Sequence, residues 1–146
     1  VDSVLAADNS NPVDAIIRAR AVTAFREQPD FEEIYPAFNR VIRILPESPS
    51  TEVKEELLVM DEEKELFNLI VEAEPELKKL KESRSYNKLI ARLSKLQPVI
   101  VEFFDEVLVM AEDESVRSNR LALLNRLAEK LFWVCDFTKL VIEGNG

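Results

Sequence analysis

Two arginines, Arg117 and Arg120, lie three residues apart in the segment "FFDEVLVMAEDESVRSNRLALL" (residues 103–124), next to a run of acidic residues. A guanidinium binds either the phosphates of a nucleic acid or the carboxylates of a neighbouring helix. At 100° per residue, Arg120 falls in the middle of an apolar helical stripe and Arg117 falls at its edge. Because a buried guanidinium must be paired, we expect Arg120 to form a structural ion pair with one of the nearest acids, Asp105, Glu112 or Asp113.

A second pair of arginines lies in residues 31–45, where apolar residues recur at i, i+3, i+4 and i+7. This rhythm predicts an amphipathic helix whose apolar stripe centres on Phe38 and whose solvent face carries Asn39, Arg40 and Arg43. Two guanidiniums one turn apart, beside a carboxamide, suit a phosphate and the edge of a base. The alternative is an ordinary solvated helix face, whose charges serve solubility.

A third group of side chains shares one face of the last predicted helix, namely Asn119, Arg126, Lys130 and Trp133. An exposed indole beside two basic side chains suits stacking with an unpaired base or a cation–π contact. It suits docking against another domain or subunit equally well, because tryptophan is enriched at protein interfaces. The residues alone leave both interpretations open.

The residue types argue against independent catalysis. The chain has no histidine and a single cysteine, Cys135, which we expect in the core. The acidic clusters at 60–65 and 110–114 lack the spacing of a calcium loop, and acids at helix starts explain both. Hydrolysis by Glu112 and Asp113 would require a carboxyl pKa raised in a cleft. We therefore expect no catalytic residue, metal or cofactor in this domain.

The charge is unevenly distributed along the chain. Its 28 acidic and 19 basic residues give a net charge of −9, which argues against a strongly basic nucleic-acid binder. Residues 47–84 hold twelve acids against six bases, whereas residues 1–46 and 85–146 carry only −2 and −1. A local basic face is therefore compatible with either end of the chain.

The composition predicts an all-α fold with a single domain over residues 1–146. The chain is 47% apolar and contains only two glycines, too few for the turns of most sheet-rich folds. Periodicity and capping residues predict a single bundle of six or seven helices. The predicted helices are 13–28, 31–45, 61–73, 76–82, 86–96, 98–110 and 114–141, with a break or bend near Pro75 and a frayed tail at 143–146.

Targeting signals are also absent from the sequence. No run of about 18 apolar residues predicts a membrane span, and no export signal opens the chain. The lone cysteine is typical of a reducing, cytoplasmic setting. Because the sequence begins at Val1 and not at a methionine, we expect it to be a fragment of a longer protein.

Several segments resemble one known family. The segment "FFDEVLVMAEDESVRSNRLALLNRL" (103–127) closely resembles a signature near the C-terminus of the bacterial glycyl-tRNA synthetase beta subunit. "RAVTAFREQPDFEEIYPAFNRVIRIL" (20–45) resembles an earlier block of that family. "ELFNLIVEAEPEL" and "YNKLIARLSKLQPVIVEFFD" continue the match in order. The resemblance covers nearly the whole chain.

This resemblance implies a helical anticodon-binding domain of the DALR type, a name that "DAIIR" (Asp14 to Arg18) loosely resembles. It further implies a parent glycine–tRNA ligase, a cytoplasmic alpha2-beta2 enzyme that uses ATP at a site on the alpha subunit. The implied partners are a glycine-accepting tRNA, the remainder of the beta subunit and the alpha subunit. Neither a membrane nor DNA is an implied partner.

Some residues can be carried over from the family's pattern. Arg40 falls on the arginine of a Lys-Arg-Val stretch, whereas Asn39 replaces its lysine and Arg43 replaces its asparagine. A phosphate contact at position 43 therefore carries over, and a specific amide contact does not. Arg117, Asn119 and Arg120 match the family pattern. The residues that we consider for tRNA binding are Arg18, Asn39, Arg40, Arg43, Arg117, Asn119, Arg126, Lys130 and Trp133.

Two functions follow from these observations. The first is recognition of a tRNA anticodon stem-loop by a helical domain of the glycyl-tRNA synthetase beta subunit. The alternative is a helical protein-interaction module that docks through its Trp133 face on another domain or subunit, without contacting RNA.

Overall fold

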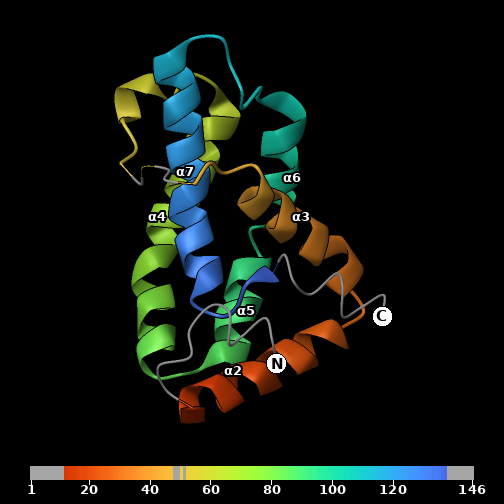
Figure 1. Ribbon diagram of the computed structural model, residues 1–146. Helices are drawn as coiled ribbons and strands as arrows, with labels where there is room; N and C mark the ends of the chain where they lie inside the picture. The colour runs from red at the N-terminus through yellow and green to blue at the C-terminus, as the bar shows by residue number, and fades with distance from the viewer. Residues whose placement is uncertain (1–11, 48–49, 51, 138–146) are drawn as a thin grey trace.

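The computed structural model describes residues 12–47, 50 and 52–137 (Figure 1). This part of the chain is all-α, as the sequence predicts, and contains no β-strand. Its elements are α2 (Pro12–Arg26), α3 (Phe31–Arg43), the 3₁₀ helix η1 (Glu55–Leu57), α4 (Asp61–Glu82), α5 (Tyr86–Ser94), α6 (Gln97–Glu106) and α7 (Glu114–Phe132). The predicted tail at 143–146 lies outside the described residues.

The two longest helices, α4 and α7, lie side by side and run in the same direction (Figure 1). Contacts follow the same order along both, with Glu63 bound to Arg120 near their starts and Lys81 over the ring of Trp133 near their ends. Helices α5 and α6 pack against α4, α3 packs against α6 and α7, and α2 packs against α5. The position of α3 is therefore fixed by its packing against α6 and α7.

The predicted starts of three helices are confirmed. Asp113 caps α7, since its Oδ1 accepts a hydrogen bond of 3.1 Å from the backbone N–H of Val116. Pro98 lies in the first turn of α6, where its missing N–H leaves no hydrogen bond unmade. Ser85 occupies the position before α5, although its side chain makes no capping hydrogen bond there.

The predicted break near Pro75 is wrong, because α4 continues through this proline to Glu82 and includes the predicted separate helix 76–82. A proline deprives the carbonyl four residues earlier of its hydrogen bond. That residue is Val71, which is 38% exposed and so lies on the outer side of the helix. The flanking residues Ala73 and Leu77 are buried and hold both halves of the helix against the core.

Helix α6 ends at Glu106, although the sequence predicted that it would reach residue 110. The next residues alternate, with Val107 and Val109 buried and with Leu108 and Met110 exposed. The helix is followed by an extended residue, Val107, with φ −105° and ψ 125°, and residues 109–110 form a turn. Four consecutive apolar residues cannot be assigned to helix or extended chain by composition alone.

Helix α7 ends at Phe132 and not near residue 141 as predicted. Val134, Cys135 and Phe137 remain completely buried although they follow the helix. Apolar burial therefore continues past the helix end, which is why the apolar pattern overestimated the helix length. The burial of Cys135 confirms its assignment to the core.

Three phenylalanine rings join the N-terminal helices to the end of the described chain. The ring of Phe38 on α3 lies 6.3 Å from that of Phe25 on α2 and 5.3 Å from that of Phe137. All three side chains are at most 1% exposed. This packing fixes the buried face of α3, so the opposite face of the helix is held toward solvent.

Candidate nucleic-acid interface

The solvent face of α3 carries the predicted residues Asn39, Arg40 and Arg43. Phe38 and Val41 are completely buried, whereas Arg40 and Arg43 are exposed and Asn39 is half-buried. The Nε of Arg43 donates a hydrogen bond of 3.0 Å to Oδ1 of Asn39. The carboxamide thus orients one guanidinium of a pair that lies one helical turn apart, as the periodicity predicted.

Arg40 lies over an aromatic ring at the junction of α3 and α6. Its Cζ is 4.2 Å from the centroid of the Phe104 ring, a cation–π geometry. A pocket of about 150 Å³ adjoins the contact and is lined by Glu33, Arg40 and apolar residues of α3 and α6. Phe104 was not predicted as part of a site, because the sequence offered only its apolar spacing within α6.

Arg120 is buried, as its place in the apolar stripe predicted, but its partner is Glu63 and not Asp105, Glu112 or Asp113. The Nη2 of Arg120 lies 2.9 Å from Oε1 of Glu63, a side chain that is completely buried. The Nη1 of Arg120 donates a hydrogen bond of 2.6 Å to the carbonyl of Leu108. The pair therefore ties α7 both to the first turn of α4 and to the segment between α6 and α7.

The predicted partners of Arg120 have other positions, and Glu112 among them is exposed. Asp113 caps α7, and Asp105 lies exposed near the end of α6. The helix α6 stops at Glu106, and Arg120 binds the backbone carbonyl of Leu108 in the segment that follows. Arg117 is half-buried, and its Nη1 donates a hydrogen bond of 3.0 Å to the carbonyl of Ala111. This bond makes Arg117 part of the turn before α7.

Arg126 and Lys130 converge on one carboxylate of α4. Arg126 donates two hydrogen bonds of 2.7 Å to the two oxygens of Glu74, and Nζ of Lys130 lies 2.8 Å from Oε2. The hydrogen bond from Arg126 lowers the pKa of Glu74 to about 2, against an opposing effect of burial and with a further contribution from Lys130. Glu74 also raises the pKa of Arg126. Two predicted RNA ligands thus form an internal ion-pair cluster.

Trp133 lies at the end of α7, half-buried beneath two ammonium groups. The Nζ of Lys81 is 4.6 Å from the centroid of the indole ring, and that of Lys130 is 5.7 Å away. The indole thus has two cations of this chain as neighbours. The sequence placed Lys130 beside the indole but gave no signal for Lys81, which reaches it from α4.

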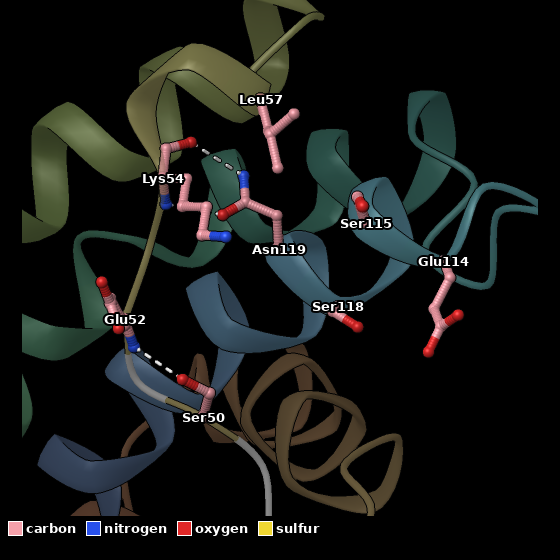
Figure 2. Close-up of a pocket in the computed structure, with 8 residues that line it drawn as sticks. All are labelled: Ser50, Glu52, Lys54, Leu57, Glu114, Ser115, Ser118 and Asn119. Carbon is pink, nitrogen blue, oxygen red and sulfur yellow. Dashed lines mark hydrogen bonds between the residues drawn. The ribbon is translucent and has the colours of Figure 1, made fainter.

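Asn119 is buried and holds an extended segment against α7 (Figure 2). Its Oδ1 accepts a hydrogen bond of 2.7 Å from the N–H of Lys54, and its Nδ2 donates one of 3.1 Å to the carbonyl of the same residue. The amide forms one wall of a pocket of about 370 Å³ between η1 and the start of α7. Both ends of the amide are thus engaged with backbone, so its hydrogen bonds position the chain before η1.

Arg18 is 1% exposed and belongs to a polar cluster under α5. Its Nε lies 3.0 Å from Oδ2 of Asp14, and the hydroxyl of Tyr86 donates a hydrogen bond of 2.6 Å to Oδ1 of the same carboxylate. Burial, together with this bond, raises the pKa of Tyr86 to about 12. Arg18 is thus buried and paired with a carboxylate of its own helix, in contrast to the exposed Arg40 and Arg43.

The structure therefore separates the nine predicted tRNA-binding residues. Asn39, Arg40 and Arg43 form one outward face, whereas Arg126, Lys130 and Trp133 form a second group whose charges are engaged internally.

Within residues 12–47, 50 and 52–137, no group of three or more histidine, cysteine or acidic residues could hold a metal ion. No helix in these ranges is both long enough and apolar enough to cross a membrane.

The sequence matches the family model of the DALR anticodon binding domain over residues 36–132, about two thirds of the chain. The chain belongs to this family. The match includes the outward face of α3, the Glu63–Arg120 pair and all of α7, so the helical architecture described above is that of an anticodon-binding domain.

Among curated proteins, the chain is similar to glycine–tRNA ligase beta subunits, which confirms the resemblance found in its sequence. It is 38% identical to the beta subunit of Desulforamulus reducens over 98% of this chain, and 42% identical to that of Thermodesulfovibrio yellowstonii over 84%. It is 36% identical to that of Neisseria meningitidis over 96%. The chain spans about a fifth of the length of these relatives.

Proposed function

We propose that this chain binds the anticodon stem-loop of a glycine-accepting tRNA, as the anticodon-binding part of a glycine–tRNA ligase beta subunit. The observation that carries the proposal is the family match over residues 36–132, which includes the exposed arginine pair on α3. The relatives named above are beta subunits of that ligase, which supports glycine as the amino acid of the tRNA.

Arg40 and Arg43 would position the RNA through its phosphates. Guanidiniums bind phosphate oxygens through two parallel hydrogen bonds, and such contacts set orientation but not sequence. Asn39 orients Arg43, and the ring of Phe104 supports Arg40, so both cations are held on the face before RNA arrives. Unpaired anticodon bases are then read by stacking and through their polar edges.

The net charge of −9 limits how tightly an isolated domain can bind RNA. A compact basic face on an acidic body supplies few phosphate contacts, so we expect affinity on the order of micromolar or weaker. The parent enzyme would add contacts outside this chain.

We further propose that ATP and the adenylate-forming site belong to the alpha subunit of a cytoplasmic alpha2-beta2 assembly.

The test is a fluorescence titration of the 146-residue chain with a glycine tRNA transcript and with the same transcript carrying an altered anticodon. The proposal predicts saturable binding that is weaker for the altered transcript. Equal affinity for both would reduce the function to a general contact with the RNA backbone. Absence of binding up to the solubility limit would refute the proposal.

A further inference from the structure

A pocket of about 350 Å³ lies between α2 and the start of α5, which meet at the lower end of the bundle (Figure 1). Three of its lining residues are cationic: Arg20, Arg84 and Lys88. The others are neutral, and none of the described lining residues is acidic. The chain as a whole has 28 acidic and 19 basic residues, so the positive charge of this pocket contrasts with the negative net charge of the protein.

The three cations come from three different elements. Arg20 lies on α2, Lys88 lies in the first turn of α5, and Arg84 lies in the turn between α4 and α5. Arg20 and Lys88 are exposed, and neither forms an ion pair within the described part of the chain. Packing of α2 against α5 therefore assembles a cationic site that no single segment of the sequence shows.

One carboxylate, Asp14, lies close to the pocket but is already engaged. Its Oδ2 is 3.0 Å from the Nε of the buried Arg18, and its Oδ1 accepts the hydroxyl hydrogen of Tyr86. Arg84 reaches the same carboxylate only at 3.7 Å, with 46% of its side chain exposed. Because Arg18 already balances the charge of Asp14, the three pocket cations leave a net positive site.

The backbone conformation of Arg84 is a second observation that points to a binding site at this pocket. Its φ is 57°, and it is the one residue other than glycine with a positive φ in the described part of the chain. Glycine commonly occupies this position after a helix, because a β-carbon is unfavourable there. The N–H of the next residue, Ser85, binds the carbonyl of Leu80 and closes the turn. An arginine at this position keeps a guanidinium at the pocket.

We propose that this pocket binds a phosphate group, and that the phosphate belongs to the backbone of the tRNA. The inference rests on the proposed function and adds a second RNA contact, separate from Arg40 and Arg43. Three converging cations suit a compact polyoxyanion, and arginine in particular matches phosphate geometry. The aromatic residue in the lining, Tyr86, is buried and its hydroxyl is bound, so the pocket offers no surface for stacking a base.

The first arm of the test uses inorganic phosphate as the probe. We expect the backbone amide signals of Asn87 and Lys88 to shift and saturate in ¹⁵N–¹H spectra, with ionic strength held constant by sodium chloride. Arg20→Ala combined with Lys88→Ala should abolish the shifts. Unchanged amide signals in the unaltered chain, or equal shifts in this variant, would overturn the phosphate site.

The second arm uses tRNA and the variant Arg84→Gly. Glycine favours the positive φ of this position, so the variant should unfold at the same or a higher urea concentration than the unaltered chain. The inference predicts that its affinity for tRNA nevertheless falls by about threefold to tenfold, and that the slope of log K against log salt decreases by about one. Removal of two exposed lysines of α4, Lys64→Ala with Lys78→Ala, is the charge control.

The outcomes distinguish free phosphate from the tRNA backbone as the ligand of the pocket. They also distinguish failure of this inference from failure of the proposed function. If phosphate shifts the amides while Arg84→Gly binds tRNA as the unaltered chain does, the tRNA backbone is not the ligand and the inference is wrong. If Arg40→Ala with Arg43→Ala weakens tRNA binding and the pocket variants do not, the proposed function stands without this inference. If the unaltered chain binds no tRNA, the proposed function and the RNA source both fail.

Discussion

The guanidinium of Arg120 and the carboxylate of Glu63 lie 2.9 Å apart in the interior, joining α7 to the first turn of α4. Oε1 of Glu63 also accepts a hydrogen bond of 3.2 Å from the N–H of Met60, and Arg120 binds the carbonyl of Leu108. One buried pair thus connects α7 with the start of α4 and with the segment between α6 and α7. Its second glutamate oxygen, Oε2, has no hydrogen-bond partner within the described part of the chain.

Arg120→Met should destabilise the fold by about 3 to 5 kcal/mol, because it leaves the carboxylate of Glu63 buried without its cation. The measurement is urea-induced unfolding followed by circular dichroism. Glu63→Leu combined with Arg120→Met should recover most of the loss, since neither charge is then left alone. A loss below about 1 kcal/mol for the single variant would show that the pair contributes little to the stability of the fold.

Asn119→Ala should loosen the segment before η1, because both hydrogen bonds to the backbone of Lys54 are lost (Figure 2). We expect a loss of about 1 to 3 kcal/mol and faster hydrogen exchange of the Lys54 amide. Asn119→Asp keeps the acceptor for that amide and should retain part of its protection. Ser118→Ala, at an exposed neighbouring position, is the matched control, and equal exchange rates in all variants would contradict this role of Asn119.

The Glu74 cluster should make the fold acid-sensitive. Since the pKa of Glu74 falls from 4.5 to about 2 on folding, its stabilisation is complete above about pH 5 and is lost as the pH falls toward 2. After allowance for partial exposure, the contribution is about 1 to 2 kcal/mol. Glu74→Gln should therefore lower stability at pH 7 but not at pH 2, as measured by urea unfolding across this range. A parallel pH profile for Glu74→Gln would count against the cluster, and Glu72→Gln serves as control.

Tyr86 should titrate at unusually high pH. Its pKa of about 12 exceeds the ordinary value of 10.0 because the neutral phenol is buried and bound to Asp14. The stabilisation from the neutral hydroxyl is present below pH 10 and is lost between pH 10 and 12. In an ultraviolet titration, the tyrosinate step near pH 12 should disappear in Tyr86→Phe. An unchanged titration curve in that variant would assign the late step elsewhere.

The position of a residue relative to the core could be predicted from the sequence, whereas its long-range partner could not. The apolar stripe predicted the burial of Arg120 and the outward face of Arg40 and Arg43, because helical periodicity alone determines these directions. Glu63 lies 57 positions from Arg120, so identifying it requires the packing of α4 on α7. Nearby acids were preferred only because they were nearer in sequence.

The same reason explains why the internal partners of several residues considered for RNA binding could not be predicted from the sequence. Arg126 looks like part of a basic helix face until Glu74, 52 positions away, is placed against it. Arg18 is different, because Asp14 precedes it by four residues and that spacing is visible in the sequence. An i, i+4 acid–base pair on a buried helix face was the signal that could have predicted its internal role.

The central claim is that the exposed guanidiniums of α3 bind the phosphates of tRNA. It is tested most directly by the salt dependence of glycine tRNA affinity for the unaltered chain and for Arg40→Ala with Arg43→Ala, with Lys64→Ala plus Lys78→Ala as the charge control. We predict that only the α3 variant loses about tenfold in affinity and that its slope of log K against log salt decreases by about two. Equal affinities and slopes for the α3 variant and the control would contradict the claim.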